Sequence, residues 1–131
     1  MPLSSDDTAC LVAALLAVNF FPVDRAYALM PAFRERGLLD PAVVGALPQE
    51  ALMSAMNEAG YRRGGFLPIL SFRLYALMEA VASGRLDALR ALAREGKREA
   101  FAALLVSVNG FGPSTAETAW QLYRTELGGT G

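Results

Sequence analysis

Several residue types are scarce in this 131-residue chain, and each scarcity limits what the chain can be. It has no histidine, one lysine and one cysteine, Cys10, which stands in an apolar run. A lone cysteine excludes an intrachain disulfide and any metal or iron–sulfur site made only of this chain's cysteines. We therefore expect Cys10 to be a small buried apolar residue, and we expect neither a metal nor another cofactor.

Net charge is also small, at −1. No overall basic field would attract nucleic acid, so such an attraction has to come from a local patch. The N-terminal MPLSSDDTAC carries no basic leader, and the apolar run from Ala9 to Phe21 is short and interrupted by Asn19. These features predict neither a signal peptide nor a membrane span, and favour a cytoplasmic protein.

The alternating apolar and polar pattern of strands is missing as well. Apolar residues make up 53% of the chain, with many alanines and leucines, which favours helix. We predict an all-α fold, a compact orthogonal bundle of about seven helices, with one domain over residues 1–127 and a flexible tail at 128–131. The helices are expected from the Ser4–Asp6 caps to about Asn19, then at about 23–36, 41 onward, 49–59, 66–83, 86–94, 97–108 and 113–127.

A Gly-Phe-Gly turn near the C-terminus, in VNGFGPSTAETAWQLY, separates the last two expected helices. The third glycine of a dinucleotide-binding loop is missing, no strand precedes the turn, and no GK[ST] sequence is present, so neither nucleotide-binding loop applies. Gly110 and Gly112 would let the backbone turn sharply and bring N–H groups against an anion, with Phe111 tucked into the domain. The helix from Pro113 would aim its positive end the same way, which suits a phosphate.

This segment resembles the helix-hairpin-helix motif, through Leu105, Val108, Gly110, Phe111, Gly112, Ala116 and Ala119. GFGPSTA is similar to the centre of that motif in the DNA glycosylases of the endonuclease III superfamily. LVAALLAVNFFPVDRAYAL and AGYRRGGFLPIL resemble that family's opening helices and a later Gly-led loop and helix. The resemblance runs from about Asp7 to Tyr123, covers the six-helix-barrel half of such enzymes, and puts the hairpin motif at about 97–123. The alternative is a Gly-rich turn in an ordinary helical bundle.

The resemblance implies a chain without its own glycosylase site. Ser114 stands where bifunctional members carry the lysine that forms a Schiff base, and Lys97, the only lysine, lies before the hairpin. The family's catalytic aspartate would fall at or beyond Gly131, and its C-terminal cysteines for an iron–sulfur cluster are absent. Glu117 is a weak catalytic candidate, since a solvated helix-surface charge explains it more simply.

The residues expected to contact DNA come from the turn and from two loops. Gly112, Ser114 and Thr115 would donate N–H groups to a phosphate, whereas Pro113 sets the helix start and has no N–H. Gly110 and Phe111 would shape the turn. The other residues expected to contact DNA are Asn19, Arg62, Arg63 and Lys97.

Each of the last four residues also has a plainer interpretation. Asn19 sits where the resemblance places a polar residue that fills the gap left by a flipped base, but it could equally satisfy backbone groups at a helix end. Arg62 and Arg63 lie in a loop resembling the family's duplex-probing loop, and could form a solvated turn instead. Lys97 belongs to a group of cations that are either a phosphate-facing patch or an ordinary surface with local ion pairs.

The sequence thus predicts a protein that binds double-stranded or damaged DNA through its phosphate backbone, without sequence preference, and that acts in DNA repair without glycosylase or lyase activity. One alternative is a minimal glycosylase, or one completed by a partner. The other is a protein-interaction module, for example a homodimer that covers exposed apolar surface.

Overall fold

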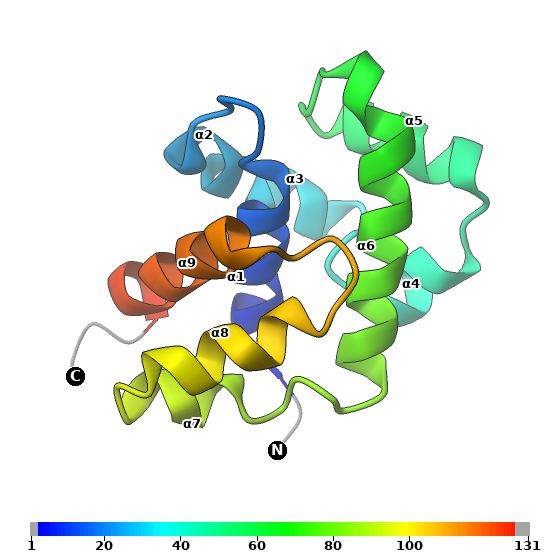
Figure 1. Cartoon of the computed structure of the whole chain (residues 1–131). Coiled ribbons are helices and arrows are strands. Elements are labelled where there is room, and N and C mark those ends of the chain that lie inside the picture. Colours follow the sequence, from blue (N-terminus) through cyan, green and yellow to red (C-terminus); the bar gives the residue numbers. More distant parts are fainter. Residues whose placement is uncertain (1–2, 128–131) are drawn as a thin grey trace.

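Helices form all of the regular structure in the computed structural model, which describes residues 3–127 (Figure 1). In chain order the elements are α1 (Ser5–Leu16), α2 (Val23–Ala28), α3 (Met30–Glu35), α4 (Pro41–Ala46), α5 (Gln49–Glu58), the 3-10 turn η1 (Gly64–Phe66), α6 (Leu67–Ala82), α7 (Leu89–Arg94), α8 (Arg98–Val106), α9 (Pro113–Leu122) and the π-helical turn η2 (Tyr123–Leu127). The described residues contain no strand, so the all-α prediction is confirmed. The expected tail, 128–131, lies outside the described residues.

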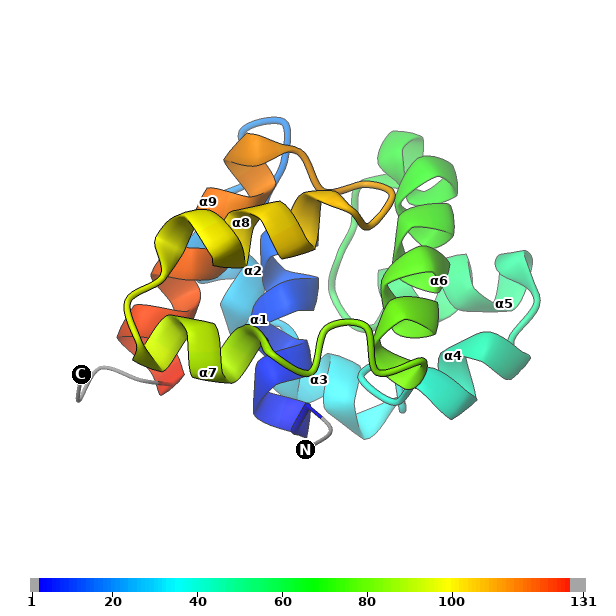
Figure 2. The ribbon, with the colours of Figure 1, turned by 60° about the horizontal axis from the view of Figure 1, so that its bottom comes forward.

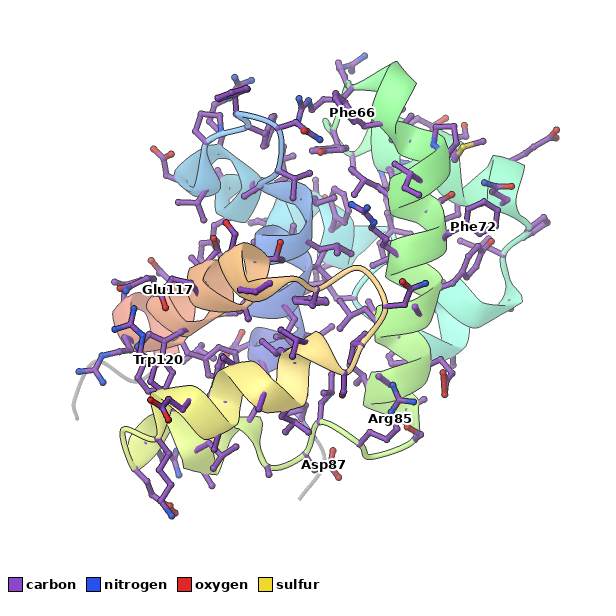
Figure 3. All side chains as sticks on the ribbon, viewed as in Figure 1. Phe66, Phe72, Arg85, Asp87, Glu117 and Trp120 are labelled. Carbon is purple, nitrogen blue, oxygen red and sulfur yellow. The ribbon has the colours of Figure 1, made fainter. Side chains whose placement is uncertain are left out.

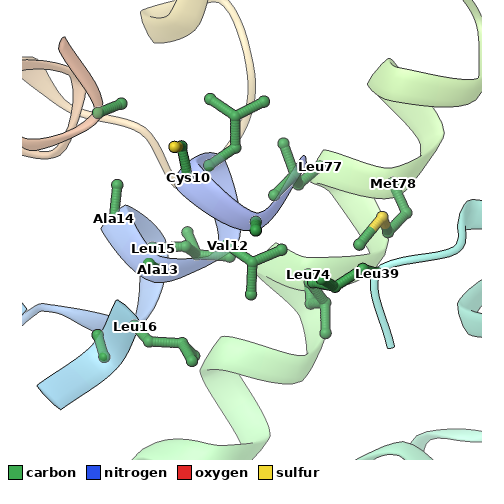
Figure 4. Close-up of a cluster of buried hydrophobic side chains, with 14 of the residues drawn as sticks. Cys10, Val12, Ala13, Ala14, Leu15, Leu16, Leu39, Leu74, Leu77 and Met78 are labelled. Atoms are coloured by element: carbon green, nitrogen blue, oxygen red, sulfur yellow. The ribbon is translucent and has the colours of Figure 1, made fainter. Parts of the chain in front are cut away.

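α1 is the central helix, and other helices cover it on all sides (Figure 1, Figure 4). It begins with a capping box: the Ser4 hydroxyl accepts from the Asp7 N–H, and the Asp7 carboxylate accepts from the Ser4 N–H. Every residue from Asp7 to Leu16 is buried, Cys10 included, as the uniformly apolar run predicted. Because α2, α6 and α9 all pack on α1, this helix fixes where their ends and loops lie.

The predicted single helix over 23–36 is wrong, because the structure divides it into α2 and α3 at Leu29. Pro31, in the first turn of α3, has no N–H, and its ring would collide with the carbonyl four residues earlier in a continuous helix. Gly37 then ends the segment with φ +76°, and the Leu38 N–H donates back to the Phe33 carbonyl at 2.9 Å, as expected for a glycine-terminated helix.

α6 is the long helix that separates α4 and α5 from α8 and α9 (Figure 1). Together with η1 it spans Gly64–Ala82, which is long and apolar enough to cross a membrane. The core helices of soluble proteins meet the same two criteria of length and composition. Leu70, Leu74 and Leu77 on α6 are fully buried in the core, whereas Ile69 and Phe72 are exposed. The apolar composition of α6 therefore serves packing on one face and leaves a second face open.

Three connecting segments that are far apart in the sequence lie in the upper part of Figure 2. They are the α1–α2 loop (17–22), the α5–α6 loop (59–66) and the α8–α9 turn (107–112). Hydrogen bonds from Arg63 join the first two, and Gly110 of the third approaches Arg73 on α6. We call the surface made by these segments and the first turn of α9 the loop face.

Candidate nucleic-acid interface

The α8–α9 turn is held by one glycine and one buried ring. Gly110 has φ +101°, and a Cβ added there would lie 2.7 Å from Cγ of Arg73. The left-handed backbone and this close approach both call for glycine. Phe111 is only 5% exposed, and its N–H donates to the Val108 carbonyl at 3.1 Å. Its ring therefore anchors the turn in the core, as expected from the sequence.

Gly112 does not shape the turn in the way that the sequence suggested. Its φ of −94° and ψ of −178° describe an extended conformation that other residues adopt freely, and a Cβ there would meet nothing within 4 Å. The expectation that both glycines are needed for turn geometry is thus corrected: the backbone demands glycine at Gly110 only.

The N-terminus of α9 presents three backbone donors. The Gly112, Ser114 and Thr115 N–H groups have no hydrogen-bond acceptor among residues 3–127, and no side chain caps the helix. The first bond that closes α9 runs from the Ala116 N–H to the Gly112 carbonyl at 2.9 Å. Gly112 and Ser114 are exposed and Thr115 is half-buried. These donors, together with the positive end of the helix dipole, can hold an anion.

Arg63 has a role that the sequence did not predict. Its guanidinium donates to the Val18 carbonyl at 2.7 Å and to the Asn19 carbonyl at 2.9 Å, and it lies 4.3 Å from the centre of the Phe66 ring. Arg63 thus joins the α5–α6 loop to the α1–α2 loop, and its expected contact with a phosphate stays a prediction. Arg62, its neighbour, is exposed.

The loop that Arg63 holds contains two successive residues with left-handed backbone. Asn19 has φ +54° and Phe20 has φ +70°. Asparagine tolerates this region, but for a bulky residue it is a genuine outlier that costs on the order of 1–3 kcal/mol. Phe20 is nonetheless fully exposed, at 104% of its reference area. No pattern in the sequence predicts this exposure, because an apolar residue after a buried helix normally continues into the core.

A groove connects this loop to α9. It has a volume of about 310 Å³ and is lined by Ala17, Phe21, Val23 and Leu122 at its apolar wall and by Glu117, Thr118, Gln121 and Thr125 along α9. Arg25 stands beside it, with its guanidinium 5.1 Å from the centre of the Phe21 ring. Neither Arg25 nor Arg62 forms an ion pair within residues 3–127, so both charges are available, Arg62 on the loop face and Arg25 on α2 next to it.

The cations that precede the turn in sequence are mostly neutralised. Lys97 pairs with Glu95 at 3.0 Å, and Arg98 pairs with Glu117. The expected patch around Lys97 is thus largely an ion-paired surface, the plainer of its two interpretations. Only weak phosphate attraction remains in that region.

The carboxylate of Glu117 is occupied by its ion pair with Arg98. Hydrogen bonds from Arg98, and next from Gln121, lower the pKa of its carboxyl group below the usual value. A general acid or base works best when its pKa lies near the working pH, so this carboxylate is poorly placed for proton transfer. It points away from the core on the outer side of α9 (Figure 3).

No group of three or more metal-binding side chains gathers within the described part of the chain. No family model, curated protein or solved structure matches this chain.

Proposed function

We propose that this protein binds DNA without sequence preference, through the phosphate backbone, and that it is related to the helix-hairpin-helix DNA glycosylases that its sequence resembles. The single observation that carries the proposal is the set of three N–H donors at the start of α9, on Gly112, Ser114 and Thr115, that lack an acceptor within residues 3–127. They directly follow the turn whose conformation is held by Gly110 and by buried Phe111.

Such an arrangement suits a phosphate oxygen. The helix dipole places positive charge at the first turn of α9, and backbone donors that are already oriented lose little freedom on binding. A contact of this kind positions a protein on a duplex and carries no base information. Arg25 on α2 and Arg62 on the α5–α6 loop would add two more backbone contacts.

We expect the affinity to be modest because the cations near the turn are few and several are paired. The logarithm of the association constant should fall with the logarithm of salt concentration by about 0.9 per phosphate neutralised. A total of about three such contacts would therefore give a slope near −3.

A non-catalytic or partner-dependent role in DNA repair or handling fits this site best. The position of the family's reactive lysine holds Ser114, and Glu117 is engaged by Arg98. A cytoplasmic location goes with this proposal. The alternative of a minimal glycosylase has one test: base release that disappears in Glu117→Gln would support it.

The proposal is tested by fluorescence anisotropy of an intact duplex, at low and moderate salt, with a matched pair of charge variants. Ser114→Glu puts a carboxylate in the first turn of α9, where it stabilises the helix but repels phosphate. Ala42→Glu makes the same change in the first turn of α4, beyond α6 from the turn (Figure 1).

Salt-dependent binding by the wild type, about tenfold or more weaker in Ser114→Glu and unchanged in Ala42→Glu, is the expected result. Equal losses in both variants would show only a dependence on net charge. Absence of wild-type binding at low salt would refute the proposal.

A further inference from the structure

Phe20 combines a strained backbone with a side chain that is not buried in the folded chain. Its backbone is left-handed, as is that of Asn19, and its ring is fully exposed. A bulky side chain normally occupies such a conformation only when surrounding contacts impose it. Burial of the ring does not offset this strain. We therefore expect the ring to contact another molecule.

The surroundings of the turn are rigid. Arg63 donates to the carbonyls of Val18 and Asn19, immediately before Phe20. On the other side, the Phe21 ring packs edge-on against Tyr61 with centroids 5.1 Å apart. Tyr61 in turn donates to the carbonyl at the end of α1, on Leu16, at 2.9 Å. Both flanks of Phe20 are thus fixed to the core.

The charge around the turn indicates the kind of partner. Arg25 and Arg62 have no ion-pair partner within residues 3–127. The helix α9, which carries the three N–H donors at its start, lines the groove opposite the same loop through Glu117, Thr118 and Gln121. An aromatic ring among phosphate-binding groups is the arrangement with which proteins stack on nucleobases. Bases inside an intact duplex are already stacked on each other, so only an unpaired base or a strand end offers a free face.

We propose that Phe20 is a stacking platform for an unpaired nucleobase, and that Arg63 is the positioning residue that holds the platform in place. The proposal rests on the proposed DNA binding and deepens it. It makes the preferred substrate a DNA duplex that contains an unpaired nucleotide, such as a bulge or a gap. The hairpin and the arginines hold the flanking phosphates, and the Phe20 ring covers the exposed base.

The test compares an intact duplex with the same duplex carrying one bulged, fluorescent aminopurine. Wild type should bind the bulged duplex about 5- to 150-fold more tightly, the range for stacking one base on an aromatic side chain, and should quench the aminopurine. Phe20→Ala should bring the affinity ratio close to one and remove the quenching, whereas Phe20→Trp should retain both.

Phe72→Ala is the matched control. Phe72 is an exposed phenylalanine, 56% accessible, on the side of α6 away from α9 (Figure 3). Its removal should leave the affinity ratio and the quenching as in the wild type. Any loss in this control would show that exposed apolar area in general, and not the platform, sets the preference, and so would overturn the proposal.

Arg63 is tested by Arg63→Gln, with circular dichroism to show that the helices persist. A freed loop should lower the affinity ratio and weaken the quenching of the bulged base. Ser114→Glu should instead weaken binding to both duplexes alike. A folded Arg63→Gln protein with wild-type quenching would overturn the positioning role.

The outcomes separate the two proposals. Equal wild-type affinity for both duplexes would overturn the stacking platform and leave the proposed phosphate binding standing. Binding to neither duplex would overturn both. Light scattering that shows a dimer broken by Phe20→Ala, with the affinity ratio unchanged, would assign the ring to a second copy of the chain and would also overturn the platform.

Discussion

The same substitution to alanine should destabilise the protein at one glycine of the α8–α9 turn and leave its stability nearly unchanged at the other. In Gly110→Ala the new Cβ has to accept φ +101° and lies 2.7 Å from Cγ and 3.0 Å from Cβ of Arg73. The side chain of Arg73 can shift, but its Cβ moves only with the backbone of α6. The strained backbone by itself costs on the order of 1–3 kcal/mol, so we expect a loss of about 2–3 kcal/mol in the free energy of unfolding.

Gly112→Ala should be nearly neutral. Its backbone is extended and the added Cβ meets no atom within 4 Å. Alanine restricts the unfolded chain, which is worth about 0.4–1 kcal/mol, but it is a poorer helix N-cap than glycine, which offsets a similar amount. The net change should stay within about 0.5 kcal/mol.

Urea unfolding followed by circular dichroism measures both variants. At unchanged slope, the expected difference between them is about 2 kcal/mol, well beyond the uncertainty of the method. Equal stability of the two variants would refute the argument that Gly110 is the glycine on which the turn depends. A larger loss in Gly112→Ala than in Gly110→Ala would refute it as well.

Three further predictions concern the core and its polar contacts. Arg90→Met should lower the free energy of unfolding by about 3 kcal/mol at neutral pH, because it leaves the buried Asp7 carboxylate without its ion-pair partner. Nε of Arg90 lies 2.9 Å from Oδ1 of Asp7, and the Arg90 side chain is 28% exposed. Burial raises the pKa of Asp7, but hydrogen bonds from Arg90 and Ser4 together lower it more. The stabilisation from this carboxylate is therefore present above about pH 4 and is lost as the pH falls through the lowered pKa. Urea unfolding at neutral pH and at about pH 3 should show this loss of stability in the wild type and a smaller loss in Arg90→Met. Tyr61→Phe should cost about 1–3 kcal/mol by leaving a buried carbonyl at the end of α1 unpaired, and a change under about 0.5 kcal/mol in thermal or urea unfolding would contradict that contact. Burial raises the pKa of Cys10 to about 12, so a thiol reagent at mildly alkaline pH should label it only after urea is added, and rapid labelling of the folded protein would contradict its burial.

Features set by neighbouring residues could be predicted from the sequence. The buried α1, the glycine end at Gly37 and the anchoring of Phe111 all follow from local patterns of apolar residues, caps and glycines. The break between α2 and α3 could have been predicted too, since Pro31 in a helix interior is a local signal. It was outweighed by the apolar spacing around it.

Features that depend on distant residues could not be predicted. Arg63 lies 45 residues from Val18, whose carbonyl it binds, and Arg90 lies 83 residues from Asp7. No pattern in either segment indicates such a partner. The left-handed backbone of Phe20 runs against its own preference, so it arises only from the surrounding contacts. Only the fold therefore adds Phe20 and Arg25 to the candidate site. It also shows that Lys97 pairs with Glu95 and that Glu117 pairs with Arg98.

The most direct test of phosphate binding observes the proposed donors themselves. Amide proton–nitrogen spectra of the labelled protein, titrated with an intact duplex at low salt, should show the Gly112, Ser114 and Thr115 signals moving first and saturably, while Ala42 in the first turn of α4 stays still. Added salt should reverse those shifts. Shifts confined to other elements, or no shifts at all, would contradict the account that the N-terminus of α9 is where this protein holds DNA.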